Sequence, residues 1–342
     1  MIFSSKKNRL TIFIAAVVVL LFLLPLFVSD NIVFRAATIL VSALFATSFN
    51  LLLGYSGLVS FGHAAYFAIG GYTLALFLQS VPSFFLGITL VILISAISAL
   101  VLGYISFRAS GIYFAILTLA LGQLVYQIFY QSKWSGGQNG MAGINAPSLR
   151  LGSMEIGIHG MPNYYFVILS FVCVSILFLR LVVKSRFGKI LISTKEDAVR
   201  ASFLGVNVRK YQLTAFVISG TLSGLAGALS APLNSIITAD IASWTNSATP
   251  IIISLLGGYS YFFGPVIGAF LYEIFNYLTS SLADSSELYI GLLLLAVILL
   301  MPRGILGVID QLRYKVGRRQ KQKMKADRNS IEKTRERKVD TL

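Results

Sequence analysis

The chain has 342 residues, of which 56% are hydrophobic and only 12% are charged. A soluble protein of this size carries roughly 25% charged residues, so this composition excludes a large water-soluble domain and indicates that lipid solvates most of the surface. The net charge of +15 is concentrated near the C-terminus, where residues 311–342 hold 12 of the 28 Lys and Arg against 4 acidic residues.

The N-terminal segment predicts a membrane helix. A basic start is followed by an apolar run from Leu10 to Val28 with no A-x-A cleavage site, which favours a span over a signal peptide. One cysteine and two histidines in the whole chain supply neither a disulfide framework nor a metal cluster.

Further spans follow along the chain, because a helix needs about 20 apolar residues to cross the hydrocarbon. Nine segments reach about this length: 10–29, 33–53, 61–80, 84–107, 111–131, 163–183, 212–231, 264–281 and 286–302. A shorter run, 245–257, contains Pro250 and either crosses the membrane or returns to the same face.

The distribution of basic residues decides between these two topologies, since Lys and Arg favour the cytoplasmic side. The N-terminus, residues 184–210 and the tail are all basic, and the tail lies inside only if the short run crosses. We therefore predict an all-α polytopic membrane protein with about ten transmembrane helices (eight to ten) and both termini cytoplasmic. Of the 28 basic residues, this topology places outside only Arg35, Lys133 and Arg150.

Small residues recur within the spans, as in Gly220 with Gly224 and Gly264 with Gly268. In lipid, such residues let helix backbones approach closely. Packing seams are the favoured interpretation, and a substrate path lined by close-packed helices is the alternative.

The cytoplasmic loop 184–211 joins the sixth and seventh spans. Within it, Ser193 and Glu196 form an S-x-x-E pattern typical of a capping box, and Gly205 can adopt the left-handed conformation that ends a helix. These signals predict one short cytoplasmic helix of about three turns.

This predicted helix carries an apolar pair. Val199 and Phe203 lie one turn apart, and Lys195 shares a face with Val199. Such a helix is suited to dock in a groove of a soluble partner, but the residues alone fit a helix lying on the membrane surface equally well. The predicted coupling residues are Lys195, Glu196, Asp197, Val199, Arg200, Phe203, Leu204 and Gly205.

The segment 185–229, from SRFGKILISTKED to SGLAGAL, resembles the second half of the LivM-type membrane subunits of branched-chain amino acid ABC importers. FNLLLGYSGLVSFGHAAYFAIGGYT at 49–73 resembles a motif of the first half. Further matches occur in the family's order, and together they cover residues 33 to about 310: GIYFAILTLALGQLVY, SGGQNGMAGI, LLGGYSYFFGPVIGA and LLLAVILLMPRGILG.

The resemblance implies a permease subunit of an ATP-binding-cassette importer, a multi-pass protein of the cell (inner) membrane that works by alternating access. It implies ABC ATPase subunits, a second homologous permease subunit and an extracytoplasmic solute-binding protein as partners. The chain itself then has no catalytic residue and no cofactor, because ATP is bound by the partner subunits. We assign residues 1–310 to the transmembrane domain.

The implied solute is a branched-chain amino acid or a related small polar solute. After the outer-loop Trp244, many relatives have S-G-E, whereas this chain has Asn246, Ser247 and Ala248. This departure leaves urea or short-chain amides as the alternative.

Residues 311–342 have almost no apolar side chains, so they cannot bury a core. We expect a disordered cytoplasmic tail that contacts anionic headgroups of the lipid bilayer, and no nucleic acid partner.

The tetrapeptide Ser135–Gln138 reads SGGQ, which also occurs in the ABC ATPase signature. No G-x-x-x-x-G-K-[ST] phosphate-binding loop occurs in the sequence, so these glycines are expected to shape a turn of an outer loop.

Two polar residues within spans are candidate pathway or gating residues, His63 and Glu273. The structural interpretation is a helix-terminus residue for His63 and a buried anchor hydrogen-bonded to a neighbouring Tyr or Asn for Glu273. A lone intramembrane acid offers little support for a secondary transporter, and no paired carboxylates or Ser–Lys pair support an intramembrane enzyme.

Overall fold

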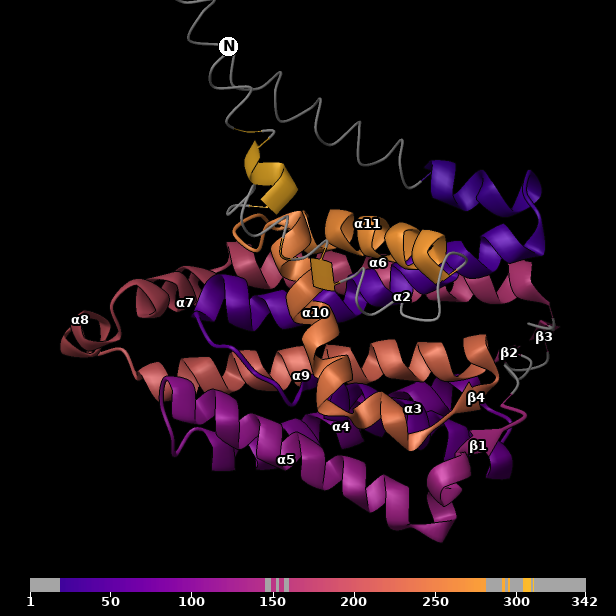
Figure 1. The fold of residues 1–342 in the computed structure, drawn as a ribbon, viewed down its shortest axis with the longest axis horizontal. Coiled ribbons are helices and arrows are strands. Elements are labelled where there is room, and N and C mark those ends of the chain that lie inside the picture. The colour runs from indigo at the N-terminus through magenta and orange to yellow at the C-terminus, as the bar shows by residue number, and fades with distance from the viewer. Residues whose placement is uncertain are drawn as a thin grey trace, which may run out of the picture.

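The computed structural model describes residues 19–144, 149–151, 154–156 and 160–280, together with 291, 292, 295, 304–308 and 310. In this part of the chain, long helices lie side by side, and short strands occur at one end of the array (Figure 1). The predicted tail 311–342 lies outside the described residues.

The helices carry most of the described chain. In chain order, they are α2 Asp30–Asn50, α3 His63–Ser80, α4 Phe84–Ser106, α5 Ile112–Gln131, α6 Met161–Lys184, α7 Arg186–Glu196, α8 Ala198–Phe203, α9 Val208–Asn234, α10 Trp244–Gly257 and α11 Gly264–Ser280. A π-helical turn, η2 (Leu51–Ser56), extends α2, and short 3-10 helices are η1 Leu24–Leu26, η3 Lys133–Ser135, η4 Gly137–Asn139 and η5 Ala239–Ala242. The strands form two antiparallel pairs: β1 Met141–Ala142 with β4 Ile236–Ile237, and β2 Leu149–Leu151 with β3 Met154–Ile156.

The seven predicted spans between residues 33 and 281 correspond to α2–α6, α9 and α11 to within a few residues. Five helical segments are long and apolar enough to cross a membrane: Asp30–Ser56, Phe84–Ser106, Ile112–Gln131, Met161–Lys184 and Val208–Asn234. This confirms a mostly helical chain with several candidate membrane spans. Of the predicted span 10–29, the structure describes residues 19–29, where a helical stretch over 19–23 gives way to η1 and a turn before α2. The predicted span 286–302 falls largely outside the described residues.

Two of these helices form the centre of the fold. In α2 and α9, 67% of the most apolar window is buried, against 28% in α4, α5 and α6. Helix α9 packs against α2, α3 and α4, and α2 also contacts α6, α10 and α11. The outer helices therefore present apolar side chains such as Ile97 and Leu177 to their surroundings, as lipid-facing helices do.

The small residues predicted as packing seams lie where backbones meet. A Cβ at Gly70 of α3 would overlap the backbone of Gly224 in α9, and one at Gly227 would overlap the carbonyl of Phe67. A Cβ at Gly268 of α11 would overlap the carbonyl of Ile253 in α10. The packing interpretation is confirmed at these positions, because any side chain would force the helices apart.

The two ends of the helix array differ. The strands lie at one end, and α7 and α8 extend from the other (Figure 1). The SGGQ segment lies close to β1, and Gly136 and Gly137 adopt left-handed conformations with φ of 78° and 58°. These glycines shape a turn, as predicted from the sequence.

The short run 245–257 forms α10, which has Pro250 inside it and spans about 21 Å at 1.5 Å per residue. It follows β4 and η5, which pack against β1 and α5. The turn after α10 contains Tyr259, whose carbonyl faces Gly54 of η2. Together with η5, the segment thus connects regions near opposite ends of the array.

Candidate functional site

The cytoplasmic loop predicted from the sequence forms two helices, α7 and α8, that protrude from one end of the fold (Figure 1). The prediction of one short helix in this loop is wrong, because Asp197 adopts an extended conformation with φ −156° and ψ 96° and separates α7 from α8. Lys195 and Val199 therefore lie on different helices and do not share a face.

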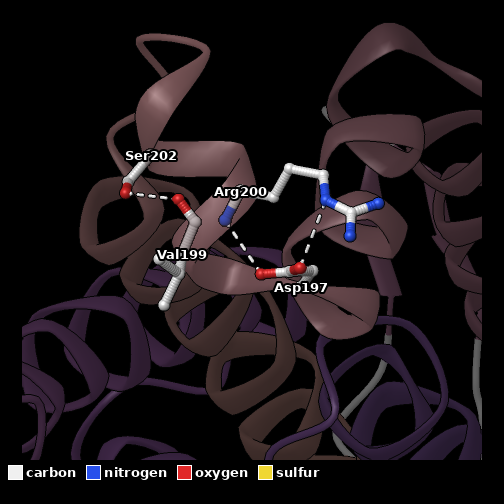
Figure 2. A network of polar contacts seen from close by, with 4 residues as sticks. All are labelled: Asp197, Val199, Arg200 and Ser202. Carbon is white, nitrogen blue, oxygen red and sulfur yellow. Dashed lines mark hydrogen bonds and ion pairs between the residues drawn. The ribbon is translucent and has the colours of Figure 1, made fainter.

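The predicted capping box is also wrong. Ser193 lies inside α7, where its hydroxyl donates to the carbonyl of Ile190 at 2.7 Å, and Glu196 is the last residue of that helix. The N-cap of α8 is Asp197, whose Oδ1 accepts a hydrogen bond from the backbone N–H of Arg200 at 2.8 Å. Its Oδ2 lies 3.3 Å from Nε of Arg200, so one carboxylate satisfies an orphan helix donor and pairs with a cation (Figure 2).

The C-terminus of α8 follows the prediction. Gly205 has φ 83°, its N–H donates to the carbonyl of Ser202, and the N–H of Val206 donates to the carbonyl of Ala201. These two bonds form a Schellman motif, which requires a left-handed residue at the position of Gly205. The hydroxyl of Ser202 also donates to the carbonyl of Val199, within the same short helix (Figure 2).

Apolar side chains on α8 and directly after it point away from the rest of the protein. Val199, Phe203 and Leu204 are 65%, 86% and 80% exposed, whereas Ala201 of the same helix is buried. Because large adjacent apolar side chains are costly to leave in water, such a patch marks an interaction surface. We call Val199, Phe203 and Leu204 the α8 apolar patch.

Lys195 does not belong to this surface. Its ammonium group donates a hydrogen bond of 2.8 Å to the carbonyl of Gly54, in the π-helical turn that ends α2. Burial lowers the pKa of Lys195 from its ordinary value, and the charge of Glu196 opposes this shift.

His63, a candidate pathway residue, is fully buried as the first residue of α3. Its Nε2 lies 2.8 Å from Oγ of Ser219, and this hydroxyl donates to the carbonyl of Ser48. The hydrogen of the Ser219 hydroxyl is thus already used, so Nε2 of His63 must be the donor, which sets the tautomer. The ring joins α3 to α9 and α2, which fits the structural interpretation of this residue.

Glu273, the other candidate, lies in α11 against α2. Its Oε1 accepts a hydrogen bond of 2.5 Å from the hydroxyl of Ser42. It also lines a cavity of about 230 Å³ together with Arg35, whose guanidinium lies 3.5 Å above the ring centroid of Tyr277. The anchor expected from the sequence has its described partner on a different helix rather than in a neighbouring Tyr or Asn.

Sequence reasoning missed a group of buried serines that connect the central helices. Ser48 and Ser223 hydroxyls lie 2.9 Å apart, and Ser247 of α10 accepts a hydrogen bond from the backbone N–H of Ala64. A signal was available, because these serines interrupt apolar spans. Among the described residues, no group of three or more His, Cys, Asp or Glu could hold a metal ion.

A family model matches residues 31–302, which contain α3 to α11 and all of α2 except its first residue. Its description is branched-chain amino acid transport system, permease component. The chain belongs to this family. Members are transport components, so the family supports a permease subunit and not an enzyme.

Two permease proteins of branched-chain amino acid transport systems align over most of the chain, and a nucleoside permease aligns over about a third of it. It is 28% identical to the high-affinity branched-chain amino acid transport system permease protein LivM of Escherichia coli (strain K12), over 92% of this chain and 79% of LivM. It is 24% identical to the permease protein LivH of the same strain, over 78% of this chain and 91% of LivH. A nucleoside ABC transporter permease protein, NupC of Lactococcus lactis subsp. cremoris (strain MG1363), is 28% identical over 35% of this chain and 38% of NupC. No solved structure matches the chain.

The cap of α8 makes a first prediction. Replacing the carboxylate in Asp197→Ala leaves an orphan N–H and should cost about 1 kcal/mol of local stability. The amides of α8 should then exchange hydrogen about fivefold faster, as measured by mass spectrometry of the purified subunit. Ser193→Ala is the matched control and should leave the exchange unchanged; equal effects of both substitutions would contradict the assignment of the cap.

Proposed function

We propose that this permease is a ten-span, multi-pass membrane subunit that pairs with a second homologous permease subunit and with ABC ATPases to import branched-chain amino acids. An extracytoplasmic solute-binding protein delivers the solute to the end that carries the strands. ATP binds to the ATPase subunits, and this chain contributes no catalytic residue and no cofactor of its own.

The observation that carries the proposal is the α8 apolar patch. It lies on a protruding helix with an N-cap at Asp197 and a Schellman stop at Gly205. Since α8 is preformed, a partner that binds it has less conformational entropy to offset. An apolar anchor on a capped helix fits a groove on a soluble subunit, which supports docking of the ATPase here.

The names of the relatives support the solute. LivM and LivH are both named as high-affinity branched-chain amino acid permease proteins, and they align over most of this chain. The departure at Asn246–Ala248 lies at the start of α10, where Ser247 is used to hold the start of α3. Because Ser247 serves helix packing, the departure from the family pattern at this position gives only weak support for urea or amides as the solute. Branched-chain amino acids therefore remain the solute we propose.

The solute is tested in proteoliposomes that contain the complete importer and its binding protein. We expect leucine, isoleucine or valine to stimulate ATP hydrolysis and to accumulate in the lumen, while urea and acetamide do neither. Stimulation by urea but not by leucine would contradict the proposed solute and favour the alternative. Uptake that collapses with an uncoupler at constant ATP would instead favour a secondary transporter.

The ten-span topology rests on the basic loops and on the segment from β4 to Tyr259, which connects the two ends of the array. In a Cys173→Ser background, a cysteine at Gln138 should react with an impermeant maleimide added to intact cells, and one at Lys189 should react only after the membrane is opened. Both positions are exposed, so accessibility within the protein does not differ. Labelling of Lys189→Cys in intact cells would contradict the topology.

The docking role of α8 predicts a loss of ATPase binding. Phe203→Ala removes an aromatic side chain that a groove would bury, an anchor commonly worth about 2 kcal/mol. The affinity for the ATPase should fall about tenfold or more, measured by titration in detergent, while pairing with the second permease subunit persists.

Leu177→Ala is the matched control for this substitution. Leu177 is 57% exposed on α6, within a membrane-spanning segment, and its replacement should leave ATPase affinity unchanged. If Phe203→Ala binds the ATPase as tightly as the unaltered subunit does, then α8 is not the anchor, and a helix on the membrane surface becomes the better interpretation.

A further inference from the structure

Lys195 connects the cytoplasmic helices to the transmembrane helices. It is the second-last residue of α7, and its ammonium donates to the carbonyl of Gly54 at 2.8 Å. The ammonium also lies 5.2 Å from the ring centroid of Tyr259, in the turn between α10 and α11. The side chain of Lys195, on α7, therefore contacts two separate parts of the membrane domain.

The contact with Gly54 satisfies a carbonyl near a helix end. Gly54 lies in η2, a π-helical turn that continues α2, and Gly57 ends this turn with φ 72°. The last carbonyls of a helix have no N–H partner within that helix, and the negative end of the helix dipole favours a cation. The stem of Lys195 lies over Gly57, where a Cβ would come within 2.9 Å of its Cγ, so the position of Lys195 depends on that glycine.

The two segments that Lys195 contacts also touch each other. The tripeptide Gly-Tyr-Ser occurs at 54–56 and again at 258–260. A Cβ at Gly54 would come within 2.5 Å of the carbonyl of Tyr259, so the two copies meet through backbone atoms with no side chain between them. Lys195 thus lies at a junction of α7, the end of α2 and the α10–α11 turn.

We propose that Lys195 is the positioning residue that transmits displacement of α8 to α2 and to the α10–α11 turn. This inference rests on the proposed docking of an ATPase at α8. Helices α7 and α8 are separated by the single residue Asp197, and Val199 of the α8 apolar patch is only four residues along the chain from Lys195. From there the hydrogen bond to Gly54 acts on α2, a central helix that runs for about 40 Å including η2.

A different route for the same displacement is the backbone, since α7 continues α6 and α8 leads into α9. If the backbone alone transmitted the motion, removal of the ammonium group would leave coupling intact. The two routes therefore differ in one measurable quantity, the amount of solute imported for each ATP hydrolysed.

The test uses the complete importer in proteoliposomes, with labelled leucine and ATP hydrolysis followed in the same sample. Lys195→Met keeps the stem and removes the charge and the donors. We expect the ratio of leucine imported to ATP hydrolysed to fall about fivefold or more, the range of a typical coupling between two sites, while ATPase affinity is unchanged. Lys195→Arg keeps a donor and a cation and should restore most of the ratio.

Lys189→Met is the matched control, because Lys189 is exposed on the same helix. An unchanged ratio in Lys195→Met, or an equal fall in Lys189→Met, overturns the inference. A loss of ATPase affinity in Lys195→Met also overturns it, since Lys195 would then belong to the docking surface. If Lys195→Met does not assemble, Tyr259→Leu takes its place, and an unchanged ratio there overturns the inference.

The proposed function is tested separately, by measuring whether the unaltered subunit binds the ATPase. If the unaltered subunit binds no ATPase, docking at α8 is refuted whatever the variants do. If it binds the ATPase and Phe203→Ala binds more weakly, docking stands, and the measurements on Lys195→Met and Lys189→Met decide the role of Lys195.

Discussion

The close contact between α3 and α9 is the constraint on which the rest of the fold depends. In lipid, the hydrophobic effect does not drive helices together, so two helices associate through packing and through hydrogen bonds. Gly70 meets the backbone of Gly224, and this approach brings His63 of α3 within hydrogen-bond distance of Ser219 of α9. The hydroxyl of Ser219 in turn reaches α2, so one backbone contact positions the polar groups that join three helices.

The end of the array from which α7 and α8 extend is positioned by α9. This helix begins at Val208, directly after the Schellman stop that ends α8, so the packing of α9 in the centre of the fold determines where α8 protrudes. The cap and the stop form within α8 itself and need no support from other elements. The α8 apolar patch therefore stays exposed and preformed, which is the condition for binding a soluble partner with little loss of entropy.

The spans were predictable because length and apolarity are local properties, and lipid selects for both. The stop at Gly205 was predictable because it is also local, since glycine adopts the left-handed conformation that ends a helix. The capping box was not, because Ser193-x-x-Glu196 and Asp197-x-x-Arg200 are competing signals four residues apart. Helix α7 begins as early as Arg186, directly after α6, and it includes Ser193, so only Asp197 remains free to cap the next helix.

The sequence by itself determined that lipid is the main solvent, which segments become helices, and that glycines form the contacts between them. Tertiary structure alone decided which polar groups meet. Lys195 binds a carbonyl 141 residues away, and Glu273 binds a hydroxyl 231 residues away. No local pattern specifies such pairs, because they exist only once α2 lies at the centre with α7 at its end and α11 at its side. The same physical reason explains why Lys195 contacts Gly54 and Tyr259 instead of sharing a helix face with Val199, as helix periodicity predicted.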